Sequence, residues 1–304
     1  MHLPTYRIKV DFAFDVFLSL FIIIIDSAMT LGAGVQWYEA YAAAEAQGRV
    51  LVGGLSEGGS VGAAGGWIMG GGHSAFSSTF GLGMSPQITR HQEITHRPTG
   101  VDNVLEFTVV TANGDNLTAN SYENPDLFWA LRGGGGGTYA VVTSVTYLTH
   151  DLFSLSMVSF SANFTTPTIA QTVTSEWVKI HPSLADQQWG GYSFLSPEGL
   201  QFFYGVPNVS LADANFTINP FVASARSQIP DLEVATVPFD SFYSFFIALF
   251  TNGTQVGDAS ELGSRLIPRD MMENNPSQVA ESMLAIDGGM TMKFVSIYSI
   301  LYVI

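Results

Sequence analysis

The feature of this sequence most able to do chemistry is a glycine run at residues 65–74, which reads GGWIMGGGHS. Because glycine has no side chain, successive backbone N–H groups can converge on an anionic group, and the backbone can approach a flat ring closely. A packing corner is the structural alternative, but the run lies between ordered elements, which favours a ligand cradle. It does not fit a Rossmann fingerprint, because the acidic residue expected about twenty positions later has no counterpart.

A second motif, residues 54–58 (GLSEG), fits the Gly-x-Ser-x-Gly pattern of a nucleophile elbow. In that interpretation Ser56 is the nucleophile of a serine hydrolase, and Asp126 with His150 or His181 completes the triad. The elbow needs a helix directly after the serine, whereas residues 58–62 (GGSVG) begin a helix poorly. The hydrolase therefore stands as a remote alternative.

Three histidines are candidate ligands or bases. His73 sits within the glycine run, where a hydrogen-bonding loop residue is the common role. His91 and His96 flank Glu93, but their spacing of five residues does not place them on one helix face, as metal ligands at i and i+4 would be. We therefore predict solvated loop residues there and no metal site.

The elements that must position the glycines follow from local patterns. The sequence predicts a domain boundary near His150, because glycine is less frequent beyond that residue. The Asn113-Gly114 pair predicts a hairpin turn. The expected helices are 35–47, 126–132, 169–180 and 212–227, and the expected strands are 49–53, 104–112, 116–119, 138–148, 154–160, 192–195 and 200–206.

Composition excludes several classes of protein. The chain has 304 residues, is 47% hydrophobic and carries a net charge of −15, so it is not intrinsically disordered and should repel phosphate backbones and anionic membrane surfaces. We expect no nucleic-acid partner. The sequence has no cysteine, which excludes disulfides, thiolate metal sites and thiol nucleophiles.

Two features favour the secretory route. Arg7 and Lys9 precede an apolar run at residues 12–25, which resembles a signal peptide and is too short for a stable membrane span; a buried element of the fold is the alternative. The sequence also has five glycosylation sequons, which begin at Asn116, Asn163, Asn208, Asn215 and Asn252. We expect a secreted glycoprotein.

Five stretches together resemble FAD-linked oxidoreductases of the berberine-bridge-enzyme-like family, especially the secreted fungal ones. They occur in the family's order over about 120 residues. These stretches are 31–37 (LGAGVQW), 61–74 (VGAAGGWIMGGGHS), 81–83 (GLG), 102–106 (DNVLE) and 124–137 (NPDLFWALRGGGGG).

The resemblance implies an α+β fold, with part of a PCMH-type (vanillyl-alcohol-oxidase-like) FAD-binding domain followed by part of an α/β substrate domain. It implies FAD as cofactor, a small-molecule substrate (an alcohol, sugar or alkaloid) and oxygen as electron acceptor. The residues expected along the FAD are Gly65, Gly66, Gly70, Gly71, Gly72, His73, Ser74, Asp102, Asn103 and Val104, and those expected near the flavin ring are Gly136, Gly137 and Val141.

The sequence also departs from the family pattern. The earlier lobe, which supplies a flavin-linked histidine, has no counterpart before about Thr30, and Gly58 stands where many members carry a flavin-linked cysteine. Residues 84–100 are an insertion, and the family's C-terminal segment has no counterpart. We therefore expect non-covalent FAD, name no catalytic residue, and expect a truncated or mis-assembled gene product, with a non-catalytic remnant as the alternative to an active oxidase.

The expected domains are a leader at 1–28, a partial FAD-binding domain at 29–150 and a partial substrate domain at 151–304.

Overall fold

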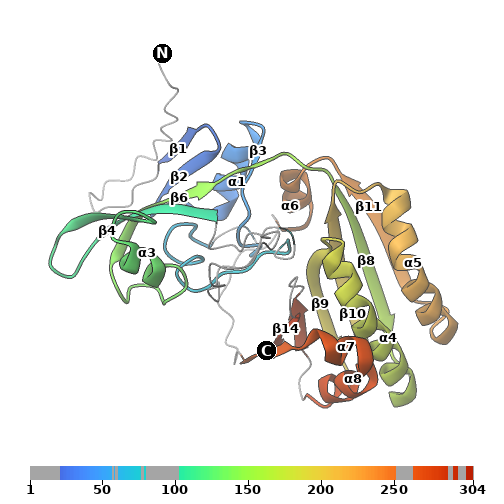
Figure 1. The fold of residues 1–304 in the computed structure, drawn as a ribbon. Coiled ribbons are helices and arrows are strands. Elements are labelled where there is room, and N and C mark those ends of the chain that lie inside the picture. Colours follow the sequence, from blue (N-terminus) through green and yellow to red (C-terminus); the bar gives the residue numbers. More distant parts are fainter. Residues whose placement is uncertain are drawn as a thin grey trace. The chain divides into compact units, whose positions relative to one another are not determined.

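The structure is a computed structural model that describes residues 21–56, 58, 61–76, 79, 103–250, 263–286, 290–293 and 299–303. These residues fall into two compact units (Figure 1). The first unit holds the described residues up to Ser74, those from 103 to 152, and the helix Phe242–Phe250. The second holds Ala75, Phe76, Thr79, Phe153–Ser241 and the described residues from Gly263 onward. The chain therefore passes between the units more than once.

The first unit is built on a five-stranded antiparallel sheet in the order β1-β2-β6-β4-β5. The predicted Asn113-Gly114 turn joins β4 to β5, with Gly114 at a φ of 86°. The elements of this unit are β1 (Ile22–Ile25), β2 (Ala28–Gly32), α1 (Trp37–Glu45), β3 (Arg49–Val50), β4 (Val104–Val110), β5 (Asn116–Asn120), α3 (Pro125–Leu131), β6 (Val141–Leu148), β7 (His150–Asp151) and α6 (Phe242–Phe250).

The last residues of the predicted apolar leader form the edge strand β1. Ile22 pairs with Leu31 and Ile25 pairs with Ala28 of β2. Residues 12–20 of that run lie outside the described residues. Within the part of the chain that is described, no helix combines the length and the apolar character that crossing a membrane requires.

Aromatic rings from distant parts of the chain form the core of the first unit. Trp37 stacks on Tyr41 within α1, with 5.3 Å between ring centroids, and it lies 5.5 Å from Tyr147 of β6. Tyr41 in turn meets Phe242 and Phe246 of α6 edge to face, at 4.9 and 5.0 Å. Such pairs add about 0.5–1.5 kcal/mol beyond the burial of their area. The apolar helix α6 therefore belongs to this core, although it lies about 200 residues after α1.

The second unit is built on a seven-stranded antiparallel sheet in the order β11-β8-β10-β9-β13-β14-β12. Two helix starts have local causes: the side chains of Thr166 and Ser210 cap α4 and α5 by accepting from Ile169 N and Asp213 N. The elements are β8 (Leu155–Asn163), α4 (Pro167–Asp186), β9 (Gly190–Ser196), β10 (Gly199–Pro207), α5 (Leu211–Gln228), β11 (Glu233–Phe239), β12 (Gly263–Ile267), α7 (Arg269–Asn274), α8 (Pro276–Leu284), β13 (Met290–Lys293) and β14 (Ser299–Val303).

Helices cover one face of this sheet. Along β10 the side chains of Leu200, Phe202 and Tyr204 join the core with residues of α4, α5, α7 and α8, whereas the alternating Gln201 and Phe203 point to the opposite face. Helices and antiparallel sheets coexist in both units, so the predicted α+β fold class is confirmed.

Several elements depart from the sequence-based expectations. The predicted strand 49–53 shortens to the two residues of β3, and the strand predicted at 138–148 begins at Val141. The elements β11 and α6 were not predicted, and neither was any element after residue 262.

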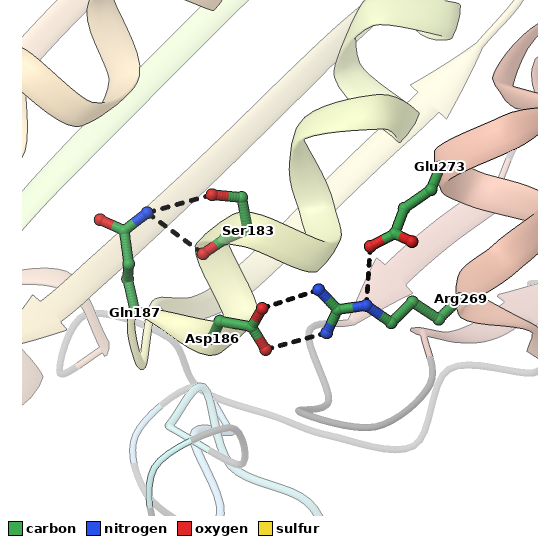
Figure 2. A network of polar contacts seen from close by, with 5 residues as sticks. All are labelled: Ser183, Asp186, Gln187, Arg269 and Glu273. Atoms are coloured by element: carbon green, nitrogen blue, oxygen red, sulfur yellow. Dashed lines mark hydrogen bonds and ion pairs between the residues drawn. The ribbon is translucent and has the colours of Figure 1, made fainter.

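A surface ion-pair network ties α7 to α4 (Figure 2). The Arg269 guanidinium donates to both carboxylate oxygens of Asp186, at 2.9 and 2.7 Å, and its Nε donates to Glu273 at 2.7 Å. Beside it, Gln187 Nε2 donates to the carbonyl and hydroxyl oxygens of Ser183, both at 3.2 Å. Exposed ion pairs typically contribute about 0–1 kcal/mol, so the network orients α7 more than it stabilises the unit.

A buried hydrogen-bond network lies between α4 and β10. The Trp177 indole N–H donates to the Tyr204 hydroxyl at 3.0 Å, and that hydroxyl donates to His181 Nε2 at 3.2 Å. His181 Nδ1 donates to the Trp177 carbonyl at 2.6 Å, so the imidazole is held neutral with its proton on Nδ1. Burial lowers the pKa of His181 from 6.5 to about 4.

Acidification should therefore weaken the second unit through His181. Its pKa is about 6.5 in the unfolded chain and lower in the folded one, so the free energy of unfolding falls as the pH drops from about 6.5 toward 4. In urea unfolding at about pH 7.5 and 5.0, the parent should lose about 2 kcal/mol more than His181→Gln, at about 1.4 kcal/mol per pH unit. Equal losses in the two proteins would contradict this role of His181.

Candidate functional site

The structure brings two glycine-rich segments together: residues 65–74, called the glycine loop below, and residues 133–137. The N–H of Gly135 donates to the carbonyl of Met69 at 2.9 Å. A Cβ built on Gly136 would lie 3.7 Å from the Gly65 carbonyl oxygen. The two segments are about 65 residues apart in sequence, so one backbone surface is assembled from both.

Two indole rings pack against the backbone of the glycine loop and of Gly53. Trp37 of α1 and Trp67 of the loop meet edge to face, with 5.2 Å between ring centroids. A Cβ on Gly72 would overlap the Trp67 ring, and a Cβ on Gly53 would overlap the Trp37 ring. The Trp67 indole N–H also donates to the His73 carbonyl at 2.9 Å. Glycine is required at residues 53 and 72 because the backbone lies directly against the rings.

Hydrogen bonds fix both ends of the segment that leads into the loop. Trp37 N donates to the Val61 carbonyl at 3.1 Å, and Ala63 N donates to the Val35 carbonyl at 2.9 Å. The Tyr147 hydroxyl donates to the Ala63 carbonyl at 2.6 Å, and burial raises the pKa of this phenol well above 10, so it remains a donor. The start of the loop is thereby attached to α1 and to β6.

Other glycines of the site face open space. No atom of a described residue lies within 4 Å of a Cβ built on Gly65 or Gly137. Within the same part of the chain, no hydrogen bond engages the backbone N–H groups of Gly65, Gly66, Gly136 or Gly137. Such N–H groups are suited to acceptor atoms of an anionic or ring-shaped ligand. The predicted cradle therefore contains glycines of two kinds, some needed for packing and some open.

Other glycines of the predicted cradle belong to the packing kind. A Cβ on Gly70 would lie 3.1 Å from the Gly66 carbonyl oxygen, and Gly71 has a φ of 76°, which side chains adopt with strain. In the second segment, a Cβ on Gly134 would overlap the carbonyl oxygen of Ala130. At these positions glycine is required by the path of the chain itself.

The remaining predicted site residues differ in burial and in the elements to which they belong. Ser74 is fully buried at the end of the glycine loop. Val104 is buried in the core and pairs with Tyr147, whereas Val141 is 66% exposed at the start of β6. Asp102 lies outside the described residues.

Asn103 is hydrogen-bonded to His150, which the serine-hydrolase interpretation placed in a catalytic triad. Its buried side-chain oxygen accepts from His150 Nε2 at 2.8 Å. Burial lowers the pKa of His150, the nearby Arg49 guanidinium lowers it further, and Asp151 opposes both. His150 therefore acts as a neutral donor that orients Asn103. Trp37, Tyr147 and His150 support the site without any local sequence signal, because each reaches it through the fold.

The serine hydrolase alternative finds no support in the geometry. Residues 51–56 form no strand, and the Ser56 hydroxyl is buried without a hydrogen-bond partner among the described residues. His150 is engaged with Asn103, and His181 lies in the second unit within the network of Tyr204. The described residues therefore lack the strand and the accessible serine that a nucleophile elbow requires.

No metal site is found within the described ranges, where no group of three or more His, Asp or Glu side chains could hold an ion. His91, Glu93 and His96 lie outside the described residues.

Comparison with known proteins identifies relatives, although no family model matches the chain. An FAD-linked oxidoreductase of Gibberella zeae is 37% identical over 257 residues, which are 82% of this chain and 42% of that protein. A VAO-type flavoprotein oxidase of Thermothelomyces thermophilus is 33% identical over 263 residues, 82% of this chain and 41% of that protein. The chain thus spans about two fifths of the length of these curated relatives.

Solved structures share the fold. A VAO-type flavoprotein of Myceliophthora thermophila superimposes with a TM-score of 0.75 at 25% identity, over 90% of this chain and 52% of that one. A glucooligosaccharide oxidase of Acremonium strictum superimposes with a TM-score of 0.68 at 15% identity, over 92% of this chain and 62% of that one. The chain, which spans about two fifths of the length of these curated relatives, therefore belongs to the FAD-linked oxidoreductases of the VAO-type, berberine-bridge-enzyme-like family.

Proposed function

We propose that this chain forms the FAD-binding and substrate-binding parts of an FAD-dependent oxidoreductase that acts on a small alcohol, sugar or alkaloid-like molecule, with oxygen as electron acceptor. The observation that carries the proposal is the joining of the two glycine segments by the bond from Gly135 N to Met69 O, with open N–H groups on both sides of it. The relatives support the reaction class.

The residues present fit FAD. The open N–H groups of Gly65, Gly66, Gly136 and Gly137 can donate to its phosphate or ring acceptors, and the absence of a Cβ allows close approach to its rings. The edge-to-face indoles that pack against the glycine loop fix the directions of those donors before binding, which reduces the ordering cost. When bound, FAD supplies the two-electron acceptor for oxidation of the substrate.

We propose non-covalent attachment of FAD. The whole sequence lacks cysteine, so a cysteinyl–flavin bond cannot form. Binding then rests on the donors of the cradle and on ring contacts, and the cofactor should exchange with free FAD in solution.

The second unit offers a surface for the substrate. On the face of its sheet opposite the helices lies an open groove of about 370 Å³. Ser159, Ser161 and Gln201 line it and make no side-chain hydrogen bond to any described residue, and the rings of Phe194 and Phe203 border them. Polar groups beside aromatic rings suit a hydroxylated ring compound.

We also propose that the protein enters the secretory route and is glycosylated. Asn116, Asn163 and Asn208 are all exposed, so glycans there would extend into solvent. Asn215 is half-buried, and its side-chain oxygen accepts from the Thr236 hydroxyl at 2.8 Å. A glycan on Asn215 would compete with this contact to β11.

Purified protein expressed with FAD should absorb at about 450 nm, as bound flavin does. Acid precipitation should release all of the yellow colour into the supernatant, because the attachment is non-covalent. A colourless preparation that takes up no added FAD would instead favour a non-catalytic remnant, and colour in the acid pellet would refute non-covalent attachment.

Two glycine substitutions in the same loop should have opposite effects. Gly65→Ala adds a methyl group to open space, so the melting temperature should stay unchanged while the FAD affinity falls by about tenfold, a cost of about 1.4 kcal/mol. Gly72→Ala forces a methyl group into the Trp67 ring and should lower the free energy of unfolding of the FAD-free protein by about 1–3 kcal/mol. Fluorescence titration with FAD and thermal melts distinguish the two; unchanged affinity in Gly65→Ala would remove Gly65 from the site.

Expression in a eukaryotic secretory host tests the glycosylation pattern. Peptide mapping after enzymatic deglycosylation should show occupied Asn116, Asn163 and Asn208 and an unmodified Asn215. Thr118→Ala should remove the modification at Asn116 alone, because it destroys that sequon and keeps the asparagine. An exported protein without glycans, or full occupancy at Asn215, would contradict the assignment.

A further inference from the structure

The chain leaves the glycine loop at Ser74 and continues at once into the second unit. Ala75, Phe76 and Thr79, called the strap below, belong to that unit by their contacts, although the loop belongs to the first unit. Ala75 and Phe76 are fully buried. The last residue of the predicted FAD loop is therefore bonded covalently to a segment that the second unit holds.

The strap packs against a pair of glycines in the sheet of the second unit. Gly190 of β9 pairs with Gly205 of β10, and a Cβ on Gly190 would overlap the Ala75 carbonyl oxygen and lie 3.2 Å from the Phe76 backbone. A Cβ on Gly205 would overlap the Met157 sulfur and would also lie 3.3 Å from the Phe76 ring. Gly190 is therefore the glycine that makes room for the strap, whereas Gly205 first makes room for Met157.

Two further contacts hold the strap in place. The Phe76 ring meets Phe153 edge to face, with 6.1 Å between centroids. The Thr79 hydroxyl donates to the Gln188 carbonyl at 2.9 Å, two residues before Gly190. The strap is thus attached at its buried start and again at Thr79.

We propose that Gly190 is a positioning residue for FAD: by making room for the strap, it fixes the residues that follow Ser74 and so helps to hold the N–H donors of the glycine loop in place. This inference rests on the proposed FAD site. A loop with five glycines among ten residues loses much backbone entropy on ordering, so its geometry depends on how its ends are held. The start is held through Ala63 and the indole rings, and the strap provides the second anchor.

The test compares Gly190→Ala with Gly199→Ala in the full chain. The first pushes a methyl group into the strap, whereas the second places one 2.8 Å from the Ala162 carbonyl oxygen, in the same sheet and away from the strap. Hydrogen exchange of the FAD-free proteins reports on the loop, because the amides of Gly70 and Gly72 are bonded to the carbonyls of Gly66 and Trp67. FAD affinity is measured by fluorescence titration.

Gly190→Ala should speed exchange at Gly70 and Gly72 by about tenfold or more and weaken FAD binding by about tenfold. Gly199→Ala should change neither, even where it lowers the melting temperature. Equal exchange in parent and Gly190→Ala, or equal acceleration in both variants, would overturn the proposal.

Thr79→Val serves as the milder variant should Gly190→Ala fail to fold. It removes only the hydroxyl donor to Gln188 and should speed exchange in the glycine loop in the same direction, by a smaller factor. Unchanged exchange in this variant would count against the strap. A parent chain that takes up no FAD would refute the proposed function, while the exchange comparison would still decide whether the strap holds the loop.

Discussion

The site depends on one packing constraint: a glycine backbone lies directly on two indole rings. Trp37 and Trp67 meet at 5.2 Å, and the chain passes against them at Gly53 and Gly72, where any Cβ would overlap a ring. Since the rings are fully or almost fully buried, they cannot move aside. The rings therefore restrict the path of the loop, and Gly65 lies where a Cβ would meet no atom of a described residue.

This constraint explains why the sequence predicts a cradle without showing which glycines would face a ligand. Both kinds of position use the same property, the absence of a Cβ, and differ only in what lies opposite. For Gly72 this is the Trp67 ring and for Gly65 it is open space. Likewise, nothing near Gly135 in the sequence indicates that its N–H bonds to Met69, because that bond joins segments about 65 residues apart.

Elements with local signals were predicted well. The Asn113-Gly114 turn, the helix expected at 169–180 and the strand expected at 200–206 have local signals, and the structure has a hairpin, a helix and a strand there. The helix α6 was not predicted, because its sequence FYSFFIALF is almost entirely apolar, and which of its residues are buried depends on distant parts of the chain. Its partner Tyr41 lies 200 residues earlier, so only the tertiary fold defines its place.

In the second unit, too, a missing Cβ allows two segments of the chain to pack closely. On the helix-covered face of its sheet, large rings and the neutral His181 network fill the core, whereas Gly190 leaves room for the backbone of Ala75 and Phe76. Glycine is destabilising in a strand unless something occupies the space it vacates, and here the strap does. In both units, then, glycines mark places where two segments of the chain must meet closely. A high glycine content in this protein reflects close backbone packing at defined positions, and the cradle is open where that packing stops.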